Sequence, residues 1–401
     1  MQSVNAEKRN LTVRYGATQF SYWASSTGAT AFATTYLLNK GVASGTVGVL
    51  LALSGLLACL TQPLLAAAAD RAKHFALTRM LLALSALCVV CFAAQLLPML
   101  PLSISGILYM IGMWSSESMS PLLSALSFAC NREGYPINYG AARGVGALAS
   151  ASASLALGFV IARLGLTWMI YFLLLFRLIS IVLLFGYPKL EKQDAAVTKK
   201  DTSCSIGSFF SRYRWYCVSL IGILFLGMYH AMTENYLIAT LGRLGGDSRH
   251  VGTAIFIASM LAAPVITCFA AIRKRIRDTG LLKIAAVSFL LQAVCYYLAK
   301  SITAVYFVQL FQLTSYAFLE PAQLHYANDK VCPSDMVKGQ AFVTAAYALG
   351  CSAGNFAGGQ LLALGVSTML GAGIGMALVG TIVIFLTVNR RDAESSARRW
   401  L

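Results

Sequence analysis

Charged residues are scarce in this sequence, since Asp, Glu, Lys and Arg make up 11% of its 401 residues while 58% are hydrophobic. A soluble domain carries roughly 25% charged residues, so the composition excludes an ordinary water-soluble globular protein. The sequence contains instead a series of apolar runs of about 20 residues, each long enough to cross a bilayer as a helix. We therefore predict an all-α polytopic membrane protein.

Catalytic and cofactor-binding motifs are also missing. The sequence has no GxSxG nucleophile motif, no P-loop, no HExxH and no dinucleotide-type glycine pattern in a suitable loop. Its four histidines share no metal-ligand spacing, and its ten cysteines are mostly isolated in apolar runs, as small buried hydrophobic residues are. We accordingly expect no enzyme, no cofactor, no metal site and no ATP-driven pump.

Basic residues between the apolar runs indicate which side of the membrane each loop faces. The net charge of +16 comes mainly from alternate loops and the two ends of the chain, whereas the remaining loops hold little more than Lys40, Arg163, Arg243, Arg249 and Lys300. Because basic loops stay inside, we expect both termini in the cytoplasm and no nucleic-acid partner. The predicted spans are 15–38, 44–67, 75–97, 102–129, 137–163, 166–187, 214–241, 250–272, 280–299, 302–327, 338–363 and 367–389.

The chain reads as a duplicated six-helix unit. Pro63 and Pro264 precede basic inner loops and lie 201 residues apart (264 − 63), and the glycines Gly140 and Gly339, which open spans five and eleven, lie 199 apart (339 − 140). The longest polar stretch, YPKLEKQDAAVTKKDTSCS, separates the halves. We predict bundles at 1–187 and 214–401 with a cytoplasmic linker at 188–213.

Glycines at every fourth position predict close contact between helices. Span eleven contains Gly350, Gly354 and Gly358, and span five contains Gly140 and Gly144. Such spacing lets two helix backbones approach closely. These glycines indicate a compact bundle and identify no ligand.

Three short stretches resemble the major facilitator superfamily of membrane transporters. TQPLLAAAADRAK resembles the inner-loop signature of that family, with Asp70 and Arg71 on its acid–base pair. Gln62-Pro63-Leu64 near its start, YGAARGVG in span five and HAMTENYL in span seven resemble the oligosaccharide–proton symporters, to which lactose permease belongs. Arg143 falls where that branch carries its substrate-binding arginine. The resemblance implies twelve helices in two six-helix bundles and secondary transport by alternating access.

The sequence departs from that branch at its ionisable residues. PLLSALSF in span four lacks the sugar-binding glutamate, and Ala262 and Ala263 stand where the branch has a glutamate ahead of the proline in span eight. Span nine offers Gln292 in place of an arginine. The proton-coupling network of the branch is therefore absent from its usual positions.

Ionisable residues inside spans cost roughly 2.5–3.5 kcal/mol on insertion scales and are usually kept for function. Glu117 in span four and Arg143 in span five are both deep enough to form an ion pair, which would either bind solute or orient the two helices. Glu234 lies one turn from His230, and Glu320 precedes Pro321, which predicts a helix break there. We predict Glu320 and then Glu234 as proton carriers, with a gate or an interhelical hydrogen bond as the alternative for each.

The leading hypothesis is a monomeric transporter in the cell membrane that takes up a small solute with protons. Sugars, nucleosides and organic acids all suit an arginine-and-aromatic site. An uncoupled facilitator or an exporter on the same scaffold is the alternative, and a receptor that moves nothing is a third. We place His325 at the solvated inner surface. Predicted solute-binding residues are Arg143, Glu117, Tyr22, Gln19, Trp114, His230, Asn235 and Gln312, and predicted gating residues are Asp70, Arg71, Arg273 and Arg275.

Overall fold

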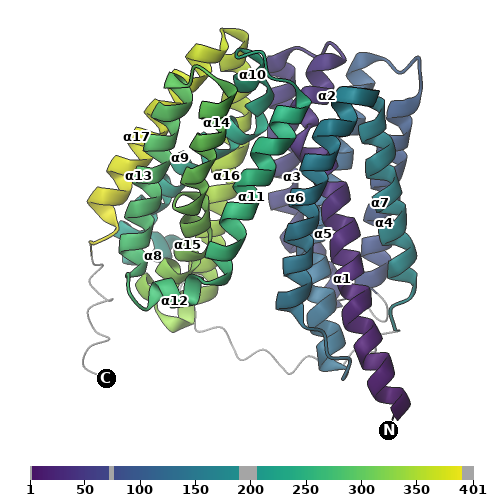
Figure 1. The fold of residues 1–401 in the computed structure, drawn as a ribbon. Helices are drawn as coiled ribbons and strands as arrows, with labels where there is room; N and C mark the ends of the chain where they lie inside the picture. The colour runs from purple at the N-terminus through teal and green to yellow at the C-terminus, as the bar shows by residue number, and fades with distance from the viewer. Residues whose placement is uncertain (1, 72–75, 189–205, 391–401) are drawn as a thin grey trace. The chain divides into compact units, whose positions relative to one another are not determined.

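The computed structural model describes residues 2–71, 76–188 and 206–390, and every regular element in these ranges is helical (Figure 1). The predicted all-α class is therefore confirmed. Contacts divide the chain into two compact units, Met1–Ala195 with Gly246–Ser259 and Ala196–Gly245 with Met260–Leu401. Most of the predicted linker, residues 189–205, lies outside the described ranges, and residues 206–212 of it form a short helix.

The first unit packs around its N-terminal helix α1, which contacts both α6 and α7. Its core contains Tyr15, Tyr22, Met119 and Leu126, all almost completely buried. The elements are α1 (Gln2–Ala31), α2 (Ala33–Asn39), α3 (Ser44–Arg71), α4 (Ala76–Ala93), the 3-10 helix η1 (Ala94–Leu96), α5 (Leu102–Arg132), α6 (Tyr139–Leu164) and α7 (Thr167–Phe185).

The second unit packs around α9, which contacts α16 and α17. Its core includes Tyr216, Ile223, Leu226 and Phe289. The elements from residue 206 onward are α8 (Ile206–Arg212), α9 (Arg214–Asn235), α10 (Leu237–Gly242), α11 (Ser248–Thr267, whose first part belongs to the first unit), α12 (Phe269–Arg273), α13 (Asp278–Leu298), α14 (Ile302–Val308), η2 (Gln309–Leu313), α15 (Tyr316–Lys330), η3 (Pro333–Asp335), α16 (Met336–Ala363) and α17 (Val366–Thr387).

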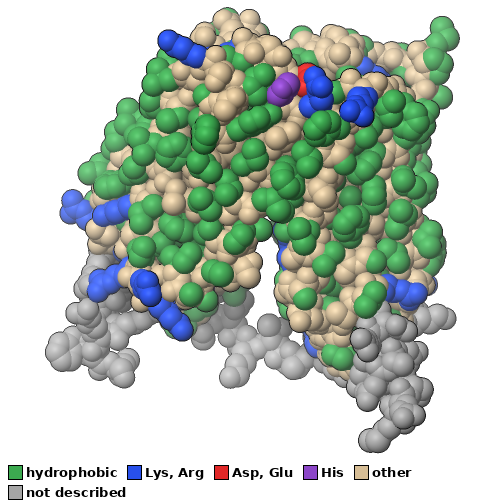
Figure 2. Space-filling view, in the orientation of Figure 1, with side chains coloured by type: hydrophobic (Ala, Val, Ile, Leu, Met, Phe, Trp, Pro, Cys, Tyr) green, Lys and Arg blue, Asp and Glu red, His purple; other side chains and the backbone are tan. Residues whose placement is uncertain are grey.

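The helices have the apolar outer surface that a lipid environment requires. Within the described ranges, nine helical segments are long and apolar enough to cross a membrane. On α7, Leu178, Val182 and Phe185 are largely exposed, while the opposite stripe, which includes Leu173 and Arg177, is buried. Figure 2 shows hydrophobic side chains over the sides of the helices, with Lys and Arg side chains toward their ends.

Two glycines bring the backbones of α9 and α16 into close contact. A Cβ atom added at Gly354 would lie 2.7 Å from both the carbonyl carbon and Cα of Met228, and Gly350 meets the backbone of Leu224 in the same way. The close approach predicted for span eleven is therefore confirmed. The equivalent prediction for span five is wrong, because Gly144 has no neighbouring atom within 4 Å and Gly140 only a loose one.

Several predicted spans are broken rather than continuous. Span seven is divided at Tyr236 between α9 and α10, and span ten consists of α14, η2 and α15. The break expected at Glu320–Pro321 is wrong in position, since Pro321 lies inside α15 and the irregular backbone precedes Tyr316. Non-helical backbone within a membrane segment is tolerated where protein or a polar cavity surrounds it.

Candidate functional site

The two helix breaks in the second unit carry the polar residues of its candidate site. The last two turns of α9, directly before the break at Tyr236, hold His230, Glu234 and Asn235. The first turns of α15, directly after η2, hold Tyr316 and Glu320. The sequence therefore places ionisable side chains where the regular helix is interrupted.

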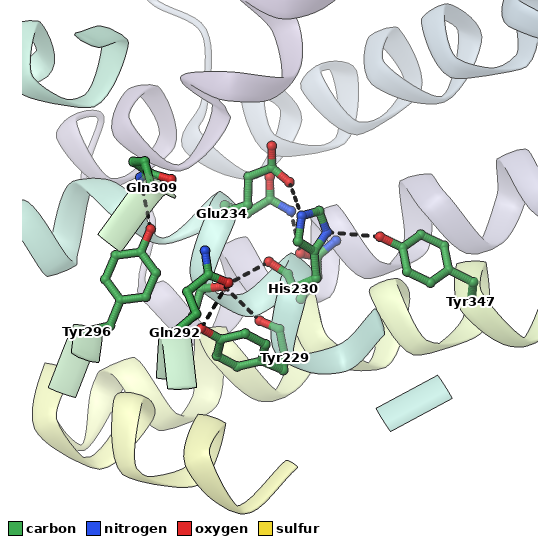
Figure 3. Close-up of polar contacts among 10 residues, drawn as sticks. Tyr229, His230, Glu234, Gln292, Tyr296, Gln309 and Tyr347 are labelled. Carbon is green, nitrogen blue, oxygen red and sulfur yellow. Dashed lines mark hydrogen bonds and ion pairs between the residues drawn. The ribbon is translucent and has the colours of Figure 1, made fainter. Parts of the chain in front are cut away.

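His230 contacts Glu234 on its own helix and Tyr347 on α16 (Figure 3). Its Nε2 lies 3.4 Å from a carboxylate oxygen of Glu234, one turn further along α9. Its Nδ1 lies 3.0 Å from the hydroxyl of Tyr347 on α16. The imidazole also stacks on Tyr316, with ring centroids 4.9 Å apart and planes 3° apart. Both ring nitrogens thus have polar partners, which suits a side chain that can hold a proton.

Glu320 belongs to the same group of side chains. Tyr316 interacts electrostatically with both Glu320 and Glu234, and Tyr347 does so as well. His230 is almost completely buried, whereas half of the Glu234 side chain is exposed. The structure thus brings together the two carboxylates that we predicted as proton carriers on different spans, and it places a histidine and two tyrosines beside them.

Amide side chains surround this group. Asn235 donates a hydrogen bond from Nδ2 to Oδ1 of Asn355 at 2.7 Å, and Tyr229 donates to Oε1 of Gln292 at 3.4 Å. Gln312 in η2 is buried, and its Oε1 has no hydrogen-bond partner in the described part of the chain. An unsatisfied buried carbonyl oxygen is unusual.

The predicted solute-binding arginine of the first unit lies against an aromatic side chain. Asn138 caps α6 by accepting a hydrogen bond from the Ala141 backbone, which places Arg143 in the first turns of the helix. The guanidinium carbon of Arg143 lies 4.3 Å from the centre of the Trp23 ring. Trp23 in turn donates a hydrogen bond from Nε1 to Oε1 of Gln19 at 2.9 Å.

Glu117 and Trp114 on α5 contact α3 instead of α6. The Ser54 hydroxyl donates to the Glu117 carboxylate at 3.4 Å, and Trp114 donates from Nε1 to Oγ1 of Thr61 at 2.9 Å. The ion pair that we predicted between Glu117 and Arg143 is not formed. Glu117 faces Ser54 on α3, whereas Arg143 faces Trp23 on α1. The positions of the two residues along the sequence do not show which neighbouring helix each side chain faces.

Arg177 is the polar residue that our sequence reasoning missed. It lies in FLLLFRLISIV near the middle of α7 and is completely buried. Its Nη2 donates to the Ser116 hydroxyl at 2.5 Å, and its guanidinium carbon lies 5.2 Å from the centre of the Tyr22 ring. The same signal that selected Glu117, an ionisable residue in an apolar span, could have found it.

The predicted gating residues lie at helix ends. Asp70 and Arg71 end α3, and their side chains lie outside the described part of the structure. Arg275 is exposed in the turn after α12, whereas Arg273 forms an ion pair with Asp278 at 2.8 Å. Hydrogen bonding to the Asp278 carboxylate raises the pKa of the Arg273 guanidinium.

A polar pocket of about 810 Å³ lies at the same end of the second unit. Arg273, Lys274 and Arg277 line it together with the acids Asp278 and Asp329. His325 also lines this pocket and stacks on Phe269. Among the side chains that the structure describes, no group of three His, Cys, Asp or Glu residues could hold a metal ion. Cys88 and Cys91 on α4 do have CxxC spacing, and both are buried free thiols.

Comparisons with known proteins agree with this architecture. The nucleoside transporter NupG, solved as a point mutant, superposes with a TM-score of 0.81 at 12% identity, covering 95% of this chain and 100% of its own. A bacterial homologue of the human lysosomal transporter Spinster gives 0.70 at 13% identity, covering 97% and 98%. A mutant of the peptide transporter POT gives 0.73 at 12% identity, covering 94% of each chain.

At these identities the structural likeness shows the fold, which is the predicted twelve-helix arrangement of this transporter architecture. No curated protein sequence matches the chain. The sequence model of the Major Facilitator Superfamily matches residues 15–355, which is most of the chain. The family is one of membrane transporters, which indicates a transport role rather than catalysis. This chain is therefore a multi-pass membrane protein that belongs to the major facilitator superfamily.

Proposed function

We propose that the chain is a secondary transporter that takes up a small polar organic solute together with protons. The solute class comprises sugars, nucleosides and organic acids. The observation that carries this proposal is the contact of His230 with Glu234 and Tyr347, beside Glu320, at the helix breaks of the second unit. Carboxylates and an imidazole in hydrogen-bond contact suit the uptake and release of a proton within a membrane protein.

The first unit supplies the solute-binding side chains in this proposal. The Arg143 guanidinium offers several charged hydrogen-bond donors beside the apolar face of the Trp23 ring. This combination suits a solute whose own ring bears polar groups. The resemblance of YGAARGVG to the oligosaccharide–proton symporters supports the same role for Arg143. The similar structures include a nucleoside transporter and a peptide transporter, which supports a polar organic solute in general.

Both termini are proposed to lie in the cytoplasm, on the strength of the basic loops. Asp70 and Arg71, with Arg273 and Arg275, are proposed to act at that side of the membrane. The exposure of Arg275 and the ion pair of Arg273 with Asp278 are compatible with an inner charged network.

Transport into proteoliposomes tests the proposal. Labelled D-glucose, uridine and D-glucuronate serve as probes, with an inward gradient of about one pH unit, which stores about 1.4 kcal/mol per proton and supports about tenfold accumulation. We expect the wild-type protein to accumulate at least one probe. Glu234→Gln and Glu320→Gln, which cannot ionise, are expected to abolish accumulation but to retain exchange of labelled for unlabelled probe.

Glu133→Gln at the C-terminal end of α5 is the matched control and should accumulate the probe normally. Accumulation that survives in both Glu234→Gln and Glu320→Gln would show that these carboxylates do not couple protons, which favours the uncoupled facilitator or exporter. If no probe is exchanged by the folded wild-type protein, the proposed solute class is wrong.

A further inference from the structure

Arg177 is a charged side chain buried without an opposite charge. It is completely buried, and in the described part of the chain it forms no ion pair. Its hydrogen-bond partners include the Ser116 hydroxyl and the sulfur of Met119, the buried Cys88 thiol lies beside it, and its Nε has no partner. An arginine held by neutral groups alone loses its hydration without a compensating charge, which costs several kcal/mol. Such a residue needs a reason to stay charged and buried.

A chain of aromatic contacts connects this arginine to Arg143. Arg177 lies 5.2 Å from the centre of the Tyr22 ring, and Tyr22 packs edge-to-face on Trp23 with ring centroids 5.2 Å apart. Trp23 carries the guanidinium of Arg143 at 4.3 Å on its ring. Tyr22 and Trp23 are consecutive residues of α1. Arg177 therefore packs against Tyr22, and Tyr22 packs against the Trp23 ring on which Arg143 lies.

The charge balance in this part of the first unit is positive. Among the described side chains of its membrane helices, Glu117 is the only acid, and its carboxylate accepts a hydrogen bond from Ser54 on α3. Because Glu117 is a single carboxylate, it offsets at most one of the two charges of Arg143 and Arg177. Arg143 is partly exposed and forms no ion pair with a described residue.

We infer that the solute is an organic anion whose carboxylate binds Arg143, and that Arg177 is a positioning residue that favours the anion through Tyr22 and Trp23. This inference rests on the proposed function and narrows its solute class to acids. A partly exposed guanidinium over a tryptophan ring can present its donors to a carboxylate in two parallel hydrogen bonds. The buried charge of Arg177 adds a favourable electrostatic interaction with an anionic solute, which a neutral solute would not gain.

Binding of acids and their neutral amides tests the inference. Thermal unfolding of the full-length protein in detergent is measured with D-glucuronate and D-glucuronamide, and with benzoate and benzamide, since a ligand of the folded state raises its stability. We expect at least one acid to stabilise the protein and its amide not to do so. Equal stabilisation by acid and amide, or by neither acid, would overturn the inference.

Variants separate the positioning role from a structural one. Arg143→Ala should weaken binding of the acid by about ten- to a hundredfold, because it removes charged hydrogen bonds. Arg177→Met should weaken it by about fivefold to tenfold, and Arg177→Lys should restore the preference for the acid over the amide. Ser25→Ala, which removes a buried hydrogen bond to Leu173 at the same α1–α7 interface, should leave that preference unchanged.

The outcomes distinguish this inference from the transport proposal. If Arg177→Met folds and keeps the full preference for the acid, Arg177 has no positioning role. If Arg177→Met does not fold, Arg177→Lys tests the positioning role instead. A folded Arg177→Lys protein that binds the amide as well as the acid would contradict the inference. Proton-driven accumulation of a neutral probe, with no binding of either acid, would overturn the anion preference and leave the proposed transport function standing.

Discussion

Replacing Gly354 with leucine is expected to leave no folded transporter. Any Cβ atom at this position would lie 2.7 Å from Cα of Met228 and would overlap its carbonyl oxygen, so the two backbones of α9 and α16 would have to separate. Backbone atoms within helices cannot turn aside as a flexible side chain can. We expect the free energy of unfolding to fall by about 4 kcal/mol or more, which is at the upper end of the effects of single substitutions. Size-exclusion chromatography of the detergent extract would show aggregated protein only.

Gly375→Leu is the control for this substitution. Gly375 lies in α17 of the same unit, and no atom lies within 4 Å of its Cβ position. Leucine there adds apolar surface to an exposed face and should give a monodisperse peak like that of the wild-type protein. A monodisperse, thermally stable Gly354→Leu protein would contradict the close helix contact. Gly354→Ala should also lower the stability of the fold, because its methyl group is still too close to Met228. The loss of stability should be smaller than in Gly354→Leu, which adds further carbon atoms.

Gly146→Leu is expected to weaken solute binding by about a hundredfold while the fold survives. Gly146 on α6 faces Trp23, and a Cβ atom added there would lie 2.5 Å from Cδ1 of the indole and 3.3 Å from Oε1 of Gln19. A leucine must therefore displace the indole, and Arg143 would lose the ring on which it lies. We expect affinity for the solute to fall by about a hundredfold, since both the charged contact and the aromatic surface are lost.

Thermal shift titration with the solute identified in the binding experiment measures this effect. Gly144→Leu is the matched control, because it lies on the same helix two residues earlier and has no neighbouring atom within 4 Å. It should bind the solute with wild-type affinity. Wild-type affinity in Gly146→Leu would mean that neither Trp23 nor the position of Arg143 on it contributes to binding.

Local features of the sequence were enough to predict the fold class. Apolar runs of membrane length and alternate basic loops are properties of short segments, and the repeat of about half the chain is found by comparing such segments. Each can be recognised without knowing what the segment touches. The glycine spacing at Gly350 and Gly354 predicted a close helix contact correctly, but the same spacing at Gly140 and Gly144 did not, because spacing does not say which neighbour a helix face meets.

The position of the helix breaks was predicted less well. Pro321 indicated a break at Glu320, yet α15 runs through it and the irregular backbone lies at Gln309–Ser315. A proline removes one donor and is tolerated within a membrane helix when neighbouring groups compensate. The break at Tyr236 had no sequence signal in our reading.

The sequence by itself determined that this chain is a bundle of membrane helices and which of its polar residues are costly enough to need a purpose. Only the tertiary structure decided which of them meet. His230 contacts Tyr347, 117 residues away, and Glu117 contacts Ser54 instead of Arg143. Arg177, which the sequence reasoning missed, proved to be completely buried. The physical reason is that insertion cost depends on residue type and depth along one helix, whereas partners depend on how helices rotate and pack against each other.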